Sequence, residues 1–240
     1  MRIIKVKDYE EASDKAFEVM KDFLKPGMVL GLATGSTPLG LYARMVKDHK
    51  ENGTSYKDIK SFNLDEYVGL PVSHPESYYT FMHRNLFDQI DIPEENTHVP
   101  SGLGEDLEAQ AKKYDEMIDA SPVDIQLLGI GSDGHIAFNE PGTPFDSGTH
   151  VTDLAESTIK DNCRFFDNDI SKVPTQAVTQ GIGTIMKAKN ILLIATGANK
   201  AQAVKDMLEG PIDVNCPASI LQKHDNVTVI IDEPAAALLS

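Results

Sequence analysis

Residues 28–38 read MVLGLATGSTP, an apolar run that is followed by a loop of hydroxyl-bearing residues and a proline. A short apolar run bounded by turn residues is typical of a buried strand. After the proline, apolar residues recur at helical spacing from Leu39 to Val46, and Pro38 suits the first turn of such a helix. The stretch therefore predicts a strand, a loop and a helix in direct succession.

The same alternation continues along the chain. Further apolar runs predict strands at residues 61–64, 125–130, 190–195 and 227–231. Helical patterns occupy residues 9–24, 77–86, 106–120 and 199–208. Strands that alternate with helices indicate an α/β fold. We predict an open, mostly parallel, Rossmann-like sheet with helices on both faces and, because no linker-like stretch interrupts the pattern, one domain over residues 1–240.

Composition narrows the classes of function. The chain has 22 Lys and Arg against 37 Asp and Glu, a net charge of −15, which argues against nucleic acid or an anionic membrane as a partner. Its two cysteines, Cys163 and Cys216, form no C-x-x-C pattern, so neither a disulfide framework nor a zinc ribbon is expected. No signal peptide and no apolar run of ~20 residues is visible. We therefore expect a cytoplasmic protein.

The expected fold also indicates where a ligand would bind. In open α/β sheets, ligands lie outside the carboxyl ends of the strands. The segments that follow the predicted strands are residues 34–38, 65–71, 131–142 and 196–200, and they are polar or glycine-rich. Functional residues are therefore expected in these four segments.

Gly35, Ser36 and Thr37 lie at the start of the helix that follows the first of these strands. Unpaired backbone N–H groups and the helix dipole favour an anion at such a position, and a phosphate would suit it. The alternative is that Ser36 or Thr37 only caps the helix, as such residues commonly do. This segment alone leaves both interpretations open.

Two neighbouring carboxylates, Asp65 and Glu66, follow the next strand. Adjacent residues in a strand project to opposite faces, so at most one of the two carboxylates can face a given cleft. The alternative is a pair of solvated loop charges.

His135 lies between two carboxylates in sequence, Asp133 and Glu140, in a tight loop after residues 125–130. A histidine flanked by carboxylates can be oriented, kept basic and used for proton transfer. The same three residues could ligate a metal, but no further strong ligand at matching spacing is visible. We favour acid–base chemistry over a metal site, with a histidine that only supports the loop as the third alternative.

Residues 129–134 also match the dinucleotide-binding pattern G-x-G-x-x-G, with Asp153 or Glu156 near the expected acidic position. Asp133 would place a negative charge in the loop that approaches a pyrophosphate. Pro141 and the glycine that follows it would end the required helix after about two turns. We therefore do not expect NAD binding.

Basic residues are scarce, so the two that follow predicted elements near the cleft stand out. Arg164 could pair with a phosphate as a bidentate fork, and Lys200 could do so as a point charge. Taken singly, each residue fits an ordinary solvated charge better than a phosphate ligand.

Taken together, five segments resemble the glucosamine-6-phosphate deaminase family, and the resemblance runs from about Leu30 to Glu233. The segments are LATGSTP at 32–38, FNLDEYVGL at 62–70, HPESYY at 74–79, GHIAFNEP at 134–141 and RFFDN at 164–168. The resemblance implies conversion of glucosamine 6-phosphate and water to fructose 6-phosphate and ammonia. It implies no metal and no organic cofactor.

The resemblance also implies roles for individual residues. Asp65 would be the base that moves the C2 proton to give an enolamine. His135 would assist opening of the pyranose ring, oriented by Asp133 and Glu140. The phosphate would be held by Gly35, Ser36, Thr37, Arg164 and Lys200.

Two alternatives share the expected fold. The comparable motifs of 6-phosphogluconolactonases usually read Asp-Glu-Arg and Asp-Gly-His-Thr, whereas this chain has Tyr67 and Ile136 at the last position of each. A sugar-phosphate-sensing domain of a transcription regulator would need a DNA-binding segment, and the 27 residues before the first predicted strand are too few for one. Both departures favour the deaminase.

Some family members are hexamers that N-acetylglucosamine 6-phosphate activates through basic side chains after the active-site glutamate. Residues 141–159 of this chain contain no Lys or Arg. We therefore predict hyperbolic kinetics without this activation and leave the oligomeric state, monomer or homo-oligomer, open.

Overall fold

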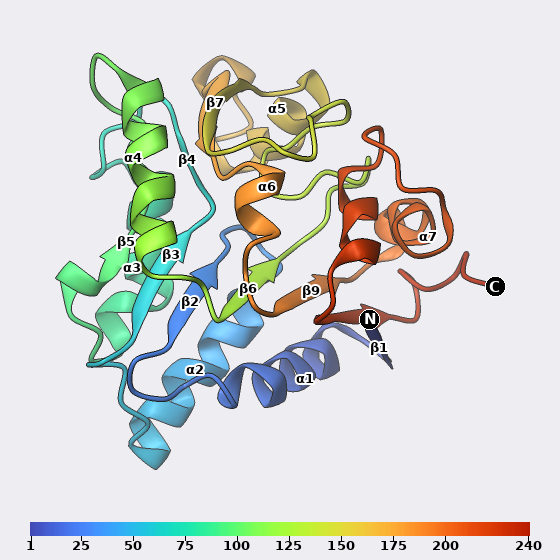
Figure 1. The fold of residues 1–240 in the computed structure, drawn as a ribbon, viewed down its shortest axis with the longest axis horizontal. Coiled ribbons are helices and arrows are strands. Elements are labelled where there is room, and N and C mark those ends of the chain that lie inside the picture. Colours follow the sequence, from blue (N-terminus) through green and yellow to red (C-terminus); the bar gives the residue numbers. More distant parts are fainter.

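The computed structural model describes residues 1–240 and has a sheet of seven parallel strands at its centre (Figure 1). The order of the strands is β1-β10-β9-β6-β2-β3-β5. Their bounds are β1 Arg2–Val6, β2 Val29–Leu32, β3 Lys60–Asn63, β5 Thr97–His98, β6 Ile125–Leu128, β9 Ile191–Ala195 and β10 Val227–Asp232. The predicted parallel sheet is thereby confirmed.

Helices cover both sides of this sheet. In Figure 1, α1 and α2 lie together below the strands, and α4, α6 and α7 lie above them. The α-helices are α1 Tyr9–Lys21, α2 Leu39–Asn52, α3 Tyr78–Asn85, α4 Leu107–Ala120, α5 Glu156–Asn162, α6 Ile182–Ile185 and α7 Ala201–Glu209. Short 3-10 turns occupy Phe87–Gln89, Glu94–Asn96, Cys163–Phe165, Ile170–Lys172, Ala198–Lys200 and Pro217–Lys223.

Burial explains which strands the sequence revealed. Strands β2, β6 and β9 are buried along their whole length, as expected for a parallel sheet with both faces covered. Strand β1 was not predicted, because it is an edge strand that carries Arg2 and Lys5 and is mostly exposed.

A second, smaller sheet was not predicted either. Strands β4 (Asp65–Tyr67), β8 (Gln176–Thr179) and β7 (His150–Asp153) pair antiparallel in the order β4-β8-β7. A small apolar cluster packs around it, made of Tyr67, Phe138, Leu154, Phe166, Val173 and Ala177. This sheet and α5 form a cap near the carboxyl ends of the main strands.

The strand order places a crevice between β2 and β6. These strands are neighbours, but the chain continues from β2 to β3 on one side and β6 adjoins β9 on the other. At such a switch point, the loops that follow the two strands diverge and leave space for a ligand.

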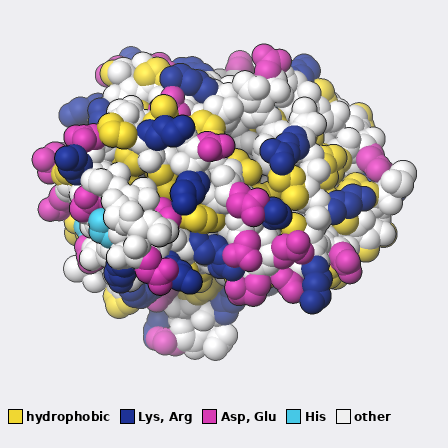
Figure 2. Space-filling model, turned by 90° about the horizontal axis from the view of Figure 1, so that it is seen from below, with side chains coloured by type: hydrophobic (Ala, Val, Ile, Leu, Met, Phe, Trp, Pro, Cys, Tyr) yellow, Lys and Arg dark blue, Asp and Glu magenta, His cyan; other side chains and the backbone are white.

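No helix of the structure has both the length and the apolar composition that a membrane span requires. On the face seen from below in Figure 2, basic and acidic side chains are interspersed. The net charge of −15 is therefore not gathered as a single acidic patch on that face.

Candidate active site

Most of the predicted functional residues line one cleft at this switch point. Seven of the nine predicted residues lie on its wall, namely Gly35, Ser36, Thr37, Asp65, His135, Arg164 and Lys200. Asp133 and Glu140 do not line the cleft but contact His135 from behind. The four segments after the strands thus meet, as the fold rule requires.

The loop after β2 presents free hydroxyls to the cleft. The N-cap of α2 is Pro38, and no side chain caps this helix. The hydroxyls of Ser36 and Thr37 are therefore not used for capping. The φ angle of Gly35 is +87°, a conformation that glycine adopts at little cost. The hydroxyl of Tyr9 donates to the carbonyl of Ser36 over 2.9 Å and fixes the loop from α1.

Two basic side chains face the same cleft from other elements. Arg164 belongs to the 3-10 turn after α5, and its guanidinium lies 4.7 Å from the centre of the Phe165 ring. Lys200 follows β9. Burial lowers the pKa of Lys200, and the charges of Asp161 and Asp133 oppose this effect.

The turn that carries Lys200 is held by a buried carboxylate. The N–H of Gly197 donates to both oxygens of Asp232 over 3.0 Å, and the N–H of Ala235 donates to the same carboxylate over 2.9 Å. The N–H of Lys200 in turn donates to the carbonyl of Gly197 over 3.0 Å. The end of β10 therefore positions Lys200 through this turn.

Asp65 is 6% exposed and lines the cleft. Burial raises its pKa to about 8; the negative charge of Glu66 adds to this effect, and the charge of His135 opposes it. Glu66 points to backbone amides instead of the cleft. The expectation that at most one of the two carboxylates faces the cleft is confirmed.

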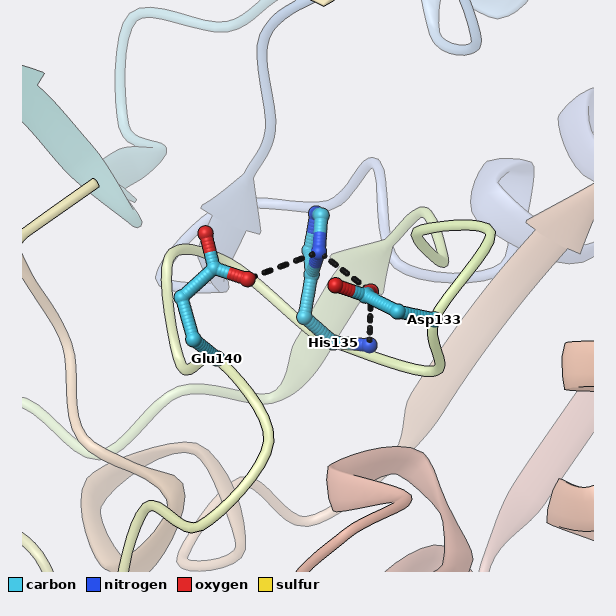
Figure 3. A group of neighbouring side chains, drawn as sticks. All are labelled: Asp133, His135 and Glu140. Carbon is cyan, nitrogen blue, oxygen red and sulfur yellow. Dashed lines mark hydrogen bonds and ion pairs between the residues drawn. The ribbon is translucent and has the colours of Figure 1, made fainter. Parts of the chain in front are cut away.

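Figure 3 shows His135 between its two carboxylates. Its Nδ1 lies 2.7 Å from Oδ1 of Asp133 and 3.4 Å from Oε2 of Glu140. Burial lowers the pKa of His135, but the two carboxylates outweigh burial and raise it to about 9. The hydrogen bond with His135 lowers the pKa of Asp133 to about 2. The histidine is therefore both oriented and basic.

Two of the three glycines in residues 129–134, Gly131 and Gly134, have a packing explanation. A side chain on Gly131 would overlap the His135 ring, 2.3 Å from its Nδ1. Gly134 has a φ of +87°, and a side chain there would lie 2.7 Å from Sγ of Cys216. No helix follows this loop before α5. The glycines thus support a histidine instead of opening a phosphate-binding helix, in line with the expectation against NAD.

The ligand atoms of Asp133, His135 and Glu140 all lie within 4.8 Å of one another, a spacing that a metal ion could bridge. The 2.7 Å between Nδ1 and Oδ1 is shorter than the ~3.4 Å that separates ligands at 2.1 Å around a tetrahedral ion. It matches the contact of an ion pair between an imidazolium and a carboxylate. The absence of a metal stays a prediction.

Several lining residues were not predicted. Thr158 of α5 donates to Oε1 of Glu140 over 2.6 Å, and Tyr78 and Phe81 of α3 line the cleft. Tyr78 lies in a segment that the resemblance includes, but neither its charge nor its spacing indicates a role. Thr158 gives no signal in the sequence, because only the fold of the cap brings it to Glu140.

Comparisons with known proteins agree with this geometry. The family model of glucosamine-6-phosphate isomerases/6-phosphogluconolactonase matches residues 9–230. A glucosamine-6-phosphate deaminase of Streptococcus uberis is 52% identical over 240 residues, which is all of both chains.

Two solved structures show how similar this chain is to a deaminase and to a lactonase. That of a monomeric glucosamine-6-phosphate deaminase superposes with a TM-score of 0.97 at 45% identity, over 99% of this chain and all of the other. That of a 6-phosphogluconolactonase from Trypanosoma cruzi has a TM-score of 0.80 at 23% identity, over all of this chain and 97% of the other, so it shows the fold alone. From the family match and the full-length identity, the chain belongs to the glucosamine-6-phosphate isomerase and 6-phosphogluconolactonase family.

Proposed function

We propose that this chain converts glucosamine 6-phosphate and water to fructose 6-phosphate and ammonia. The observation that carries the proposal is the pairing of two proton-transfer groups in one cleft: the buried carboxyl of Asp65 and the imidazole of His135. The full-length relative at 52% identity is a glucosamine-6-phosphate deaminase, which supports this substrate.

The basic and hydroxyl-bearing residues of the same cleft hold the phosphate in this proposal. Arg164 and Lys200 supply charge-assisted donors, and the loop of Gly35, Ser36 and Thr37 supplies backbone and hydroxyl donors. This local positive charge allows an anionic substrate to bind a chain of charge −15, because fields at contact range depend on nearby groups.

Ring opening comes first in the proposed mechanism. It requires a proton to leave the C1 hydroxyl and another to reach the ring oxygen, and His135 can both accept and donate one. Asp133 and Glu140 hold the imidazole in one orientation and stabilise its protonated form. Ring opening yields the open-chain aldehyde.

Isomerisation follows at C2. Asp65 accepts the C2 proton while the C1 oxygen takes up the proton that the substrate ammonium releases, which gives an enolamine. Asp65 then returns its proton to C1 to give a protonated ketose imine. Water then adds to the imine carbon, and ammonia leaves. Because burial raises the pKa of Asp65 to about 8, its conjugate acid can also return the proton near neutral pH.

The alternative is hydrolysis of a sugar-phosphate lactone. It is weaker because Tyr67 occupies the position where lactonase motifs usually have arginine, and its hydroxyl accepts a 2.9 Å hydrogen bond from Asn162 inside the cap. The lactonase likeness extends to the fold alone.

Incubation with each sugar phosphate tests the proposal. With a metal chelator present, we expect ammonia and fructose 6-phosphate to form in equal amounts from glucosamine 6-phosphate. Hydrolysis of 6-phosphogluconolactone without ammonia release would overturn the proposal. The cytoplasmic location stays a prediction.

A further inference from the structure

Glu66 is a buried carboxylate that the mechanism does not use. It follows Asp65 in β4 and is 4% exposed. Its Oε1 accepts hydrogen bonds from the N–H groups of Tyr67 over 2.8 Å and of Tyr78 over 2.9 Å, and its Oε2 accepts one from Tyr79 over 3.0 Å. Burial raises the pKa of this carboxyl, and the hydrogen bonds from the three backbone N–H groups oppose that effect because they favour the ionised form.

Two of these donors begin helix α3. The first four N–H groups of a helix have no partner inside it. In α3, Glu66 accepts from the first two, at Tyr78 and Tyr79, while Ser77 accepts the next two through its hydroxyl and its carbonyl. Glu66 therefore joins β4 to the positive end of α3.

This junction lies next to the reacting groups. Asp65 at one side of it and Tyr78 at the other both line the cleft. Strand β4 has only three residues and is paired to β8. The hydrogen bonds between Glu66 and the start of α3 are a second set of contacts that hold this strand in place. A shift of Glu66 would move the backbone of Asp65 directly.

We propose that Glu66 is a positioning residue for Asp65, fixing the backbone that carries the base and supplying the negative charge beside it. The inference rests on the proposed function, in which Asp65 is the base.

The charge effect can be predicted from the ionisable groups whose charges interact with Asp65. These are the carboxylate of Glu66 on β4, the imidazole of His135 from the loop after β6, and the phenols of Tyr67, Tyr78 and Tyr114. Burial and the charge of Glu66 raise the pKa of Asp65, and His135 opposes them. Removal of the Glu66 charge should lower this pKa.

Two variants separate charge from position. Glu66→Gln keeps the size but removes the charge, so the acid limb of kcat/KM should move by about one pH unit to lower pH. Glu66→Asp keeps the charge but cannot reach all three N–H groups. Its acid limb should stay in place while kcat falls about tenfold or more, because the base is displaced.

Ser77→Ala is the matched control. It removes another cap of the same helix, so it should lower the stability of the folded chain while the acid limb keeps its wild-type position. A purely structural role for Glu66 would make all three variants alike in their pH profiles.

The following outcomes decide whether the inference about Glu66 holds. An acid limb of Glu66→Gln at the wild-type pH, or a wild-type kcat for Glu66→Asp, would overturn the inference. If Glu66→Gln does not fold, Glu66→Asp decides alone. Asp65→Asn distinguishes a failure of the proposed function from a failure of the inference about Glu66. Activity in Asp65→Asn would refute the role of Asp65 as the base. An inactive Asp65→Asn, together with an acid limb of Glu66→Gln at the wild-type pH, would refute only the role of Glu66.

Discussion

The buried carboxyl of Asp65 lowers the stability of the folded protein when it is ionised, and its proposed role as the base explains why the carboxyl is buried there. Its pKa of about 8 in the folded chain lies above the value of about 3.9 for an unperturbed Asp. Between these pH values, the folded state binds a proton that the unfolded state has released, so stability falls as pH rises from about 4 through 8. Above pH 8 the full cost of a buried charge is present.

We therefore predict that Asp65→Asn stabilises the protein at alkaline pH. At pH 9 the free energy of unfolding should rise by about 2 kcal/mol, and the gain should shrink towards pH 5, where the wild-type carboxyl is protonated in the folded state. Urea denaturation at the two pH values measures both quantities. An equal effect at pH 5 and pH 9 would contradict the proposed burial of the charge.

The phosphate contacts give a second prediction for single residues. Lys200→Ala and Arg164→Ala should each raise KM by about 30-fold, which corresponds to about 2 kcal/mol for a charge-assisted hydrogen bond. Some loss of kcat can accompany this if phosphate binding orients the sugar. Lys160→Ala is the control, because that side chain is 67% exposed and pairs only with Glu156. An unchanged KM in both cleft variants would refute the phosphate pocket.

Among the elements, those with strong local signals were predictable. Strands β2, β6 and β9 are continuous apolar runs, and their burial on both faces reproduces that pattern. The sheet β4-β8-β7 was not predicted, because its strands mix polar with apolar residues and pair residues far apart in sequence, such as Asp65 with Thr179. Short strands of this kind depend on tertiary contacts and not on local periodicity.

The candidate site shows the same division. Residues in polar loops after strong strands, such as Ser36 and His135, were predictable because the fold rule indicates where those loops meet. Thr158 and Tyr78 reach the cleft through the cap and α3, so no spacing in the sequence connects them to it. The roles of the nine predicted residues stay predictions.

The element that positions Lys200 gives a third prediction. Asp232→Asn removes one acceptor oxygen from Gly197 and places an amide donor near its N–H. We expect KM to rise about tenfold, the equivalent of one hydrogen bond, with a smaller change in kcat. Asp106→Asn is the control, since Asp106 accepts the N–H of Ala109 at the start of α4, away from the cleft. Steady-state kinetics of the folded variants measures both; a wild-type KM for Asp232→Asn would contradict this positioning role.

For the whole molecule, the distribution of charge bears on regulation. Residues 141–159 contain β7 and no Lys or Arg, so an anionic effector would meet uncompensated acidic groups such as Asp146 and Asp153 there. A phosphate gains affinity chiefly from charge-assisted donors. This segment therefore offers an anionic effector no Lys or Arg to bind.

We predict hyperbolic kinetics that N-acetylglucosamine 6-phosphate does not change. An effector shifts a conformational equilibrium only if it binds two states with different affinity. Rates should be measured against substrate concentration with and without the acetylated sugar phosphate. A sigmoidal curve that becomes hyperbolic with the effector would refute this prediction.

Proton transfer by Asp65 depends on the molecule as a whole, because the strand order, the cleft and the cap together place this carboxyl at the switch point. Deuterium incorporation in heavy water, followed by NMR of the sugar phosphate, tests it most directly. The wild-type protein should introduce deuterium during conversion of glucosamine 6-phosphate. Asp65→Asn, nearly isosteric but not basic, should bind the substrate with a similar Kd and show neither exchange at C2 nor ammonia release. Exchange or turnover above a few per cent of the wild-type rate in Asp65→Asn would contradict the account.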